Sequence, residues 1–226
     1  MASFAIIPIM KMQARDLSAG LTKAKHAYRS LKKMIVDGGF AKRRWSVRLL
    51  ASKLGMSVVP VSEALRRLEQ EQLIDIKPQS GIHLRRMSTK ELAEAMLFRQ
   101  ALECQAARIV SAEGNQKILA DLESLAALVE DRRLKQGQAG YLDYQFHQRM
   151  VAGAGCELLV AKFDEIATRC LTKAPGHEGW PPVRWPDSEQ DHLKIVRAIQ
   201  SRSPAQAQRA IRNHIRAERI MSAIKE

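Results

Sequence analysis

The sequence predicts a mainly α-helical protein in two parts, a small basic one followed by a larger and nearly neutral helical one. Aromatic residues make up only 5% of the 226 residues, which favours helix over a β-sandwich. Residues 1–90 hold 18 Lys and Arg against 6 Asp and Glu, a net +12, whereas residues 91–226 hold 19 against 18, a net +1. Because this length has room for two modest cores, we expect an N-terminal extension over 1–22, a basic domain over 23–86 and a helical domain over 87–226.

Charge and cysteine content limit the kinds of function. A block with a net charge of +12 attracts polyanions through counterion release, and nucleic acid is the plainest of them. An anionic membrane and a merely solubilising surface are the alternatives. The three cysteines show no CxxC spacing, which fits reduced thiols better than a disulfide framework or structural zinc. The short apolar start contains Pro8 and makes a poor signal peptide, and no later window has the length of a transmembrane helix, so we expect a cytoplasmic protein without a membrane partner.

The basic domain is expected to begin with three helices. Apolar residues recur at helical spacing over residues 23–37, where two glycines end the run. Ser46 can cap a short second helix that stops at Gly55. Ser57 can cap a third helix with Pro60 in its first turn, where a missing N–H costs nothing. A short helix, a turn containing glycine and a second helix make a helix-turn-helix.

A β-hairpin is expected to follow the third helix. Two short alternating segments, 73–76 and 82–85, flank the turn signal Pro-Gln-Ser-Gly. A helix-turn-helix with such a wing is a DNA-binding arrangement, in which the third helix enters the major groove and flanking basic groups hold phosphates.

The stretch GMSVVPVSEALRRLEQEQLIDIKPQSGIHL resembles the winged helix-turn-helix of the GntR family of bacterial transcription regulators, a resemblance that covers about residues 24–86. Two positions depart from the family pattern, since Val58 and Ser62 stand where arginines usually contact guanine. The protein should therefore read a different or less guanine-dependent sequence. The resemblance and the expected groove contact give these candidate DNA-binding residues: Arg48, Ser57, Val58, Val59, Ser62, Arg66, Lys77, Gln79, Ser80 and Gly81.

The second domain is expected to be an antiparallel bundle of six helices. Ser88 and Glu91 form a capping box at its start. A long proline-rich loop should precede the fifth helix, which Ser188 caps, and Ser203 with Pro204 should begin the sixth. The first four helices are expected over about residues 88–112, 116–136, 141–153 and 157–172.

Asp143 and His147 are the first half of a candidate metal site. On a helix they lie one turn apart on the same face, so a carboxylate oxygen and an imidazole nitrogen can converge on one point. A hydrogen bond on the helix surface, or a histidine satisfied in the core, is the alternative. His192 and His214 each lie eleven residues from Ser203, so an antiparallel hairpin around that turn would place both imidazoles at the same height.

The pattern Asp-x-x-Phe-His in LDYQFHQRM, the segment RQALECQAAR and the segment DHLKIVRAIQSRSPAQAQRAIRNHI resemble the effector-binding FCD-type domain of the FadR subgroup of the same family, over about residues 88–222. The resemblance implies a divalent metal held by Asp143, His147, His192 and His214, and a small organic acid effector that completes the coordination. One carboxylate with three imidazoles suits zinc, nickel, manganese or iron.

Two further residues and one departure belong to this predicted site. The effector carboxylate needs a buried cation, for which Arg99 is the first candidate and Arg212 the second. Cys156 stands where the family commonly has Asn, and we expect it to be structural.

We therefore predict a ligand-responsive transcription regulator that binds a double-stranded DNA operator as a homodimer and is not an enzyme. A metal-dependent hydrolase with a basic docking domain is an alternative, although no HExxH arrangement or obvious general base accompanies the four ligands. A nonspecific architectural DNA binder is another, given Val58 and Ser62. The effector, the operator and the direction of regulation are not encoded in any pattern that we recognise.

Overall fold

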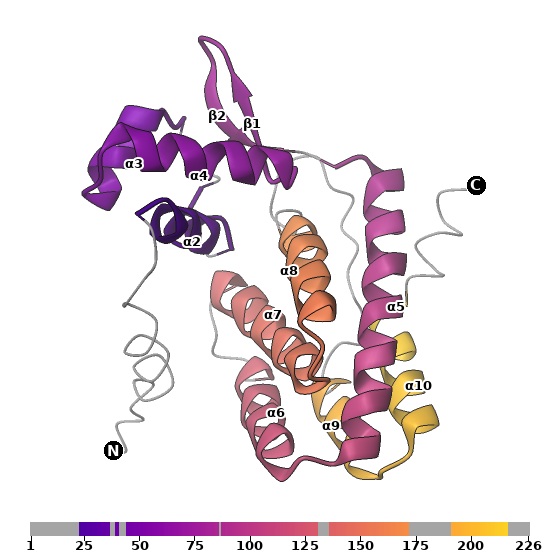
Figure 1. The fold of residues 1–226 in the computed structure, drawn as a ribbon. Coiled ribbons are helices and arrows are strands. Elements are labelled where there is room, and N and C mark those ends of the chain that lie inside the picture. Colours follow the sequence, from indigo (N-terminus) through magenta and orange to yellow (C-terminus); the bar gives the residue numbers. More distant parts are fainter. Residues whose placement is uncertain are drawn as a thin grey trace. The chain divides into compact units, whose positions relative to one another are not determined.

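A computed structural model describes residues 23–36, 39–40, 44–85, 87–130, 136–171 and 191–216. The described residues fall into two compact units that divide near Leu84. Within them, the first unit has three helices and a two-stranded sheet, and the second has six helices (Figure 1). Each unit buries a hydrophobic cluster of its own. The predicted fold class, a winged helix-turn-helix followed by a six-helix bundle, is confirmed.

The three helices of the first unit have the predicted starts and ends. They are α2 (Lys23–Val36), α3 (Val47–Leu54) and α4 (Val58–Gln70). Ser46 caps α3 by accepting a hydrogen bond from the N–H of Leu49, and Gly55 ends it in the left-handed conformation at φ 64°. Ser57 is the N-cap of α4, but its side chain makes no capping hydrogen bond. The first turn of α4 therefore keeps N–H groups that its own cap does not satisfy.

The wing is an antiparallel hairpin of β1 (Ile74–Lys77) and β2 (Gly81–Leu84), one residue displaced from the predicted segments. Trp45 extends the sheet, because its carbonyl accepts the N–H of Ile82 at 2.9 Å. Gly81 lies at φ +92°, and a Cβ there would come 2.6 Å from the Trp45 carbonyl oxygen. Both the backbone conformation and this close approach require glycine.

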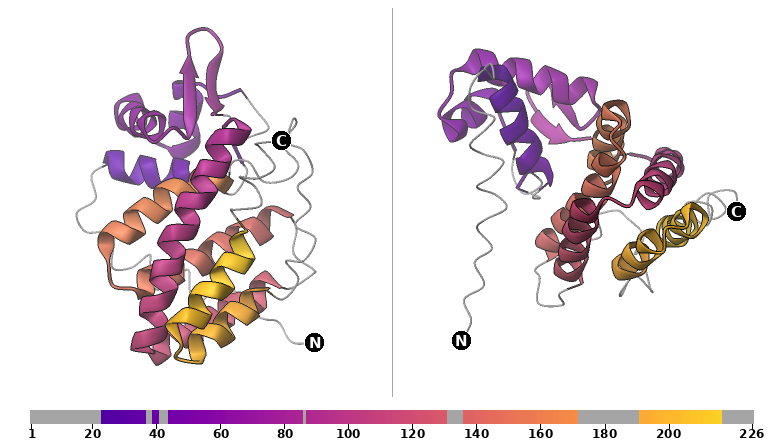
Figure 2. Two further views of the ribbon diagram at one scale, coloured as in Figure 1. Left: turned by 90° about the vertical axis from the view of Figure 1, so that its right-hand side faces the viewer. Right: turned by 60° about the horizontal axis from the view of Figure 1, so that its bottom comes forward.

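The second unit is a bundle in which the long helix α5 contacts helices on both sides. Helix α5 packs against α10, α7 and α8, while α6 packs against α7 and α9 (Figure 2). The Ser88–Glu91 capping box is present, with both reciprocal hydrogen bonds. The helices are α5 (Thr89–Glu113), α6 (Gln116–Val129), α7 (Gln136–Gly153), α8 (Glu157–Leu171), α9 (Asp191–Gln200) and α10 (Pro204–Ile215).

The predicted boundary between the second and third helices of this unit was wrong. We expected one helix to reach residue 136 and the next to begin near Tyr141, but α6 ends at Val129 and α7 begins at Gln136. Two glycines, at 137 and 140, suggested a break, yet they fall in the first turns of α7, where tertiary packing of the rest of the helix outweighs their low propensity. The predicted loop of residues 173–190, with its Ser188 cap, lies outside the described residues.

Candidate functional site

Helix α7 and the α9–α10 hairpin bring the four predicted ligands together. One side-chain atom from each of Asp143, His147, His192 and His214 lies within 4.8 Å of the other three. His147 Nε2 is 3.1 Å from His214 Nε2, and His192 Nε2 is 3.0 Å from Asp143 Oδ1. Side chains separated by up to 71 positions in the sequence therefore converge on one point.

The short turn between α9 and α10 aligns two of these imidazoles. The ring centroids of His192 and His214 lie 4.7 Å apart, as expected if both rings lie at one height along an antiparallel hairpin. Phe146, which is fully buried, packs edge-on against His147 and His192 with centroids 5.2 and 4.8 Å away. This aromatic wall restricts the rings to a few orientations.

Glu103 is a buried partner of the cluster that the sequence did not identify as such. Its Oε2 lies 2.5 Å from His147 Nδ1, an ion-pair contact when His147 is protonated. Its Oε1 accepts a hydrogen bond from Arg99 Nε at 2.5 Å. Both carboxylate oxygens are thus engaged, one by α5 itself and one by α7. The spacing of four between Arg99 and Glu103 was the available signal, but the contact to His147 depends on helix packing.

The surroundings of each group favour a charged Glu103 and Asp143. Burial by itself raises the pKa of Glu103, but Arg99 and His147 outweigh it and lower the pKa to about 2. Burial likewise raises the pKa of Asp143, and the facing imidazoles of His147 and His192 lower it well below its usual range. For His147, burial lowers the pKa, while Glu103 and Asp143 raise it to about 8. Burial and the neighbouring imidazoles lower the pKa of His214 to about 3.

The donor set fits a divalent transition metal. Metal–ligand bonds of about 2.0–2.2 Å place two ligand atoms of a tetrahedral ion about 3.3–3.6 Å apart, so the separations of up to 4.8 Å in the cluster would shorten by as much as roughly 1.4 Å around a bound ion. With a proton on His147 Nδ1, facing Glu103, His147 Nε2 is left with a lone pair toward the cluster. His192 Nδ1 is buried without a hydrogen-bond partner among the described residues. Three imidazoles and one carboxylate match zinc, nickel, manganese or iron.

The two candidate effector arginines differ in their surroundings. The Arg99 side chain is only 11% exposed, and its charge acts on Asp143. Its Nε–H is the one N–H group of the guanidinium that meets an acceptor in the described part of the chain. Arg212 lies on α10 two positions before His214, which turns it about 200° around the helix, and it is exposed. The structure thus keeps Arg99 beside the cluster and directs Arg212 to solvent.

Cys156 is exposed and is not among the four clustered residues.

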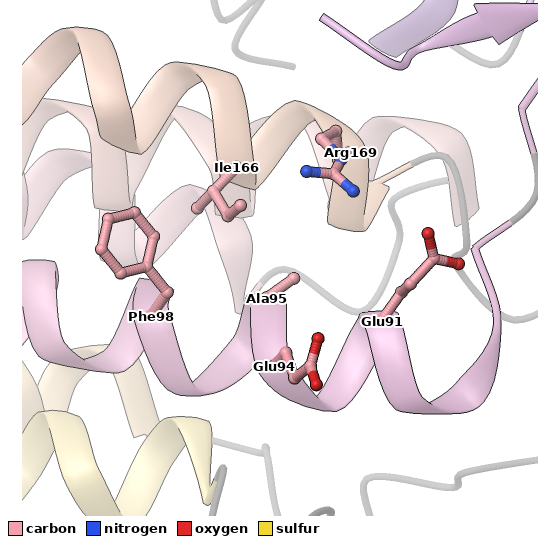
Figure 3. A pocket seen from close by; sticks show the side chains of 6 residues that line it. All are labelled: Glu91, Glu94, Ala95, Phe98, Ile166 and Arg169. Atoms are coloured by element: carbon pink, nitrogen blue, oxygen red, sulfur yellow. The ribbon is translucent and has the colours of Figure 1, made fainter.

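An open pocket elsewhere, between α5 and α8, shares none of its lining residues with the cluster (Figure 3). The figure shows Phe98 and Ile166 at one end of this pocket and the charged side chains at the other. The pocket is lined by Glu91, Glu94, Ala95, Phe98, Ile166 and Arg169.

The candidate DNA-binding residues lie on three elements of the first unit. Val58 and Val59 are adjacent in the sequence, and each lies three, four, seven or eight positions from Ser62 and Arg66, so the four residues share one broad face of α4. Except for the partly exposed Ser62, these four are exposed, as is Arg48 on α3. The predicted wing residues Lys77, Gln79 and Ser80 are also exposed, and Gly81 is partly exposed. Ser80 Oγ lies 2.9 Å from His83 Nε2, which fixes the tip of the hairpin.

Comparison with known proteins places the chain in a family. The model for bacterial regulatory proteins of the gntR family matches residues 23–84, and the model for the FCD domain matches residues 94–217, more than half of the chain. The chain belongs to the GntR family of bacterial transcription regulators. Its helical unit is an FCD domain, as the sequence resemblance implied. The chain is therefore a DNA-binding regulator rather than the hydrolase considered above.

Individual relatives agree with this assignment. The HTH-type transcriptional repressor GlaR of Escherichia coli is 26% identical over 83% of this chain and 90% of its own length. A probable D-xylose utilization operon transcriptional repressor of Paenarthrobacter nicotinovorans is 26% identical over 74% of each chain. The solved structure of E. coli McbR/YncC shares the fold with a TM-score of 0.76 at 17% identity, over 91% of this chain and 99% of that one. No helix in the described part of this GntR regulator has the length and hydropathy of a membrane span.

Proposed function

We propose that this chain is a cytoplasmic, ligand-responsive repressor that binds a palindromic operator as a homodimer. In this proposal, Asp143, His147, His192 and His214 hold a divalent metal, and Arg99 binds the carboxylate of a small organic acid that completes the coordination. The observation that carries the proposal is the convergence of one carboxylate and three imidazoles on a single point in the FCD domain. Repression is proposed because two of the relatives described above are named repressors.

The Glu103–Arg99 pair gives the proposed site a reason to favour an acid. Bound metal adds positive charge beside Arg99, whose remaining N–H donors face no acceptor among the described residues. A carboxylate that bridges the ion and a guanidinium makes charge-assisted hydrogen bonds in a site of low exposure. A neutral ligand gains less from both groups, because it brings no negative charge opposite the ion and the guanidinium. The metal supplies an electrophilic anchor when bound, and Arg99 supplies orientation.

A short connection can transmit the state of the FCD domain to DNA. Strand β2 ends at Leu84 and α5 begins at Thr89, so residues 85–88 form the linker. Arg85 Nη2 donates a hydrogen bond to Glu91 Oε1 at 3.1 Å, which ties this linker to the first turn of α5. A ligand that binds one arrangement of the helical bundle better than another shifts the population between the two arrangements. Because the linker is short, we propose that this shift also changes the position of the winged helix-turn-helix domain.

Exposed apolar side chains on α5 and α8 support the proposed dimer. Leu97 and Phe98 are 43% and 46% exposed on α5, and Leu158 is 69% exposed on α8. Leu97 and Phe98 are adjacent in the sequence of α5, and an exposed apolar patch marks a surface that another protein covers. In this proposal the second copy of the chain covers them, and the two winged helix-turn-helix domains of the dimer then contact successive turns of the DNA major groove.

DNA selection tests the regulatory function. The protein should retain particular fragments of its own genome over bulk DNA by a factor of about a thousand or more at physiological salt. Light scattering of the complex should give two chains per selected duplex. Equal retention of all fragments would instead favour the architectural alternative, and one chain per duplex would overturn the dimer.

The variant Arg99→Lys tests the effector site. Lysine retains the charge opposite Glu103 but loses the planar guanidinium that holds a carboxylate through two bonds. We expect the concentration of small di- and tricarboxylates that changes DNA binding to rise roughly 10- to 100-fold. Arg212→Lys is the matched control, because Arg212 is exposed, and it should respond like the unaltered protein. An unchanged response of Arg99→Lys would remove Arg99 from the effector site.

A further inference from the structure

Two adjacent valines are exposed in the first turn of α4, the recognition helix of the helix-turn-helix. Val58 is 45% exposed and Val59 is 67% exposed, whereas the next two residues, Pro60 and Val61, are buried. Folding gains little from this placement, because about half of Val58 and two thirds of Val59 stay in water. Helix formation gains nothing either, since β-branched residues lose side-chain freedom in helices. The two side chains are therefore available to contact something outside the chain.

The surroundings of these valines are suited to DNA. The first turn of α4 contains no acidic residue, and the Ser57 side chain makes no capping hydrogen bond. Unsatisfied N–H groups and the positive end of the helix dipole favour a negatively charged partner at this point. Arg66 follows on the same face two turns later and is exposed. The first turn of α4 thus presents two apolar side chains at an otherwise electropositive end of the helix.

The groups on the edges of the bases identify what two exposed valines can recognise in DNA. In the major groove, guanine, adenine and cytosine present hydrogen-bonding groups, and thymine alone adds an apolar one, its C5 methyl. A valine side chain has no donor or acceptor, so it gains only from contact with that methyl group. An arginine at the same position would instead donate two hydrogen bonds to guanine.

We propose that Val58 and Val59 recognise the C5 methyl groups of thymines at fixed positions in each half-site of the operator. This inference rests on the proposed function, because it assumes that α4 reads a specific operator. It goes beyond that function by naming the atoms that are read. Burial of each thymine methyl against a valine replaces the guanine contact, so the base pairs that the two valines contact are A·T pairs.

Substitution of deoxyuridine for thymine tests the proposal, because it removes the methyl group and nothing else. Duplexes would first be selected from a random pool by the full-length protein, and each thymine of the selected half-site would then be replaced in turn. At one or two positions we expect the Kd to rise about fourfold, the value of one buried methyl group. At other thymines the Kd should not change.

Variants of the protein test whether the two valines cause this rise in Kd, which we call the deoxyuridine penalty. In Val58→Ala or Val59→Ala the penalty for deoxyuridine should shrink toward none at the matching position. Leu128→Ala is the control, because Leu128 is also exposed but lies on α6, and it should retain the full penalty. Val58→Arg should shift the selected base toward guanine.

The outcomes separate this inference from the proposed function. A selected sequence without any deoxyuridine penalty overturns the methyl contact and leaves the regulator intact. A penalty that persists unchanged in both valine variants assigns the methyl contact to another residue and also overturns the inference. Failure to select any sequence overturns the proposed function and, with it, this inference.

Discussion

Replacing His214 by alanine is expected to lower the affinity of the protein for Zn²⁺ or Ni²⁺ by more than about 100-fold. His214 Nε2 lies 3.1 Å from His147 Nε2 and contributes one of four converging ligand atoms. Loss of a residue that merely orients a ligand costs about 10- to 100-fold in metal affinity, and loss of the ligand itself removes a bond as well. Competition with a chromophoric chelator measures the affinity directly.

Stability gives a second readout of the same variant. A metal that binds only the folded protein stabilises it by about 2.7 kcal/mol at a free concentration 100 times the Kd. At one fixed metal concentration, His214→Ala should lose most of this stabilisation, measured for each protein as the difference between its metal-bound and metal-free free energies of unfolding. His26→Ala is the control, because His26 is exposed on α2. Equal metal affinity in His214→Ala and the unaltered protein would remove this residue from the ligand set.

The local signals in the sequence were sufficient for most of the fold. Ser46 with Gly55, and Ser88 with Glu91, mark helix ends through backbone hydrogen bonds that involve only neighbouring residues. Such ends can be read without tertiary information. The beginning of α7 at Gln136 could not, because glycine weakens a helix locally while packing of the distant apolar face decides the outcome.

The candidate site likewise combines contacts that the spacing of residues predicts with contacts that depend on how the helices pack. Asp143 and His147 are paired by helical spacing alone, and the equal distances of His192 and His214 from Ser203 anticipated their approach across a hairpin. The contact between Glu103 and His147 could not be predicted, because it depends on how α5 packs against α7. The exposure of Arg212 could have been predicted, because two positions on a helix turn it about 200° away from His214.

Replacing Glu103 by alanine is expected to destabilise the FCD domain by about 3–5 kcal/mol in metal-free buffer. The Glu103 side chain is fully buried and that of Arg99 is 11% exposed. Without the carboxylate, a guanidinium remains in the interior without its hydrogen-bonded partner, and breaking a buried pair in this way costs about 3–5 kcal/mol. Urea unfolding followed by far-ultraviolet circular dichroism measures the loss.

An exposed ion pair of the same domain provides the control. Lys162 Nζ and Glu165 Oε2 lie 2.9 Å apart, but their side chains are 51% and 40% exposed. Water already solvates both charges, so Glu165→Ala should cost less than about 1 kcal/mol. Comparable losses in Glu103→Ala and Glu165→Ala would show that burial of the Arg99 pair contributes little.

A double variant distinguishes the unpaired charge from the loss of packing. In Arg99→Met combined with Glu103→Leu, both charges are removed and apolar volume is retained, so much of the stability lost in Glu103→Ala should return. If the double variant is as unstable as the single one, the loss comes from packing and not from an uncompensated guanidinium. Recovery of stability together with weakened metal binding would show that the pair is retained to orient His147, because a more stable apolar core was available to the same fold.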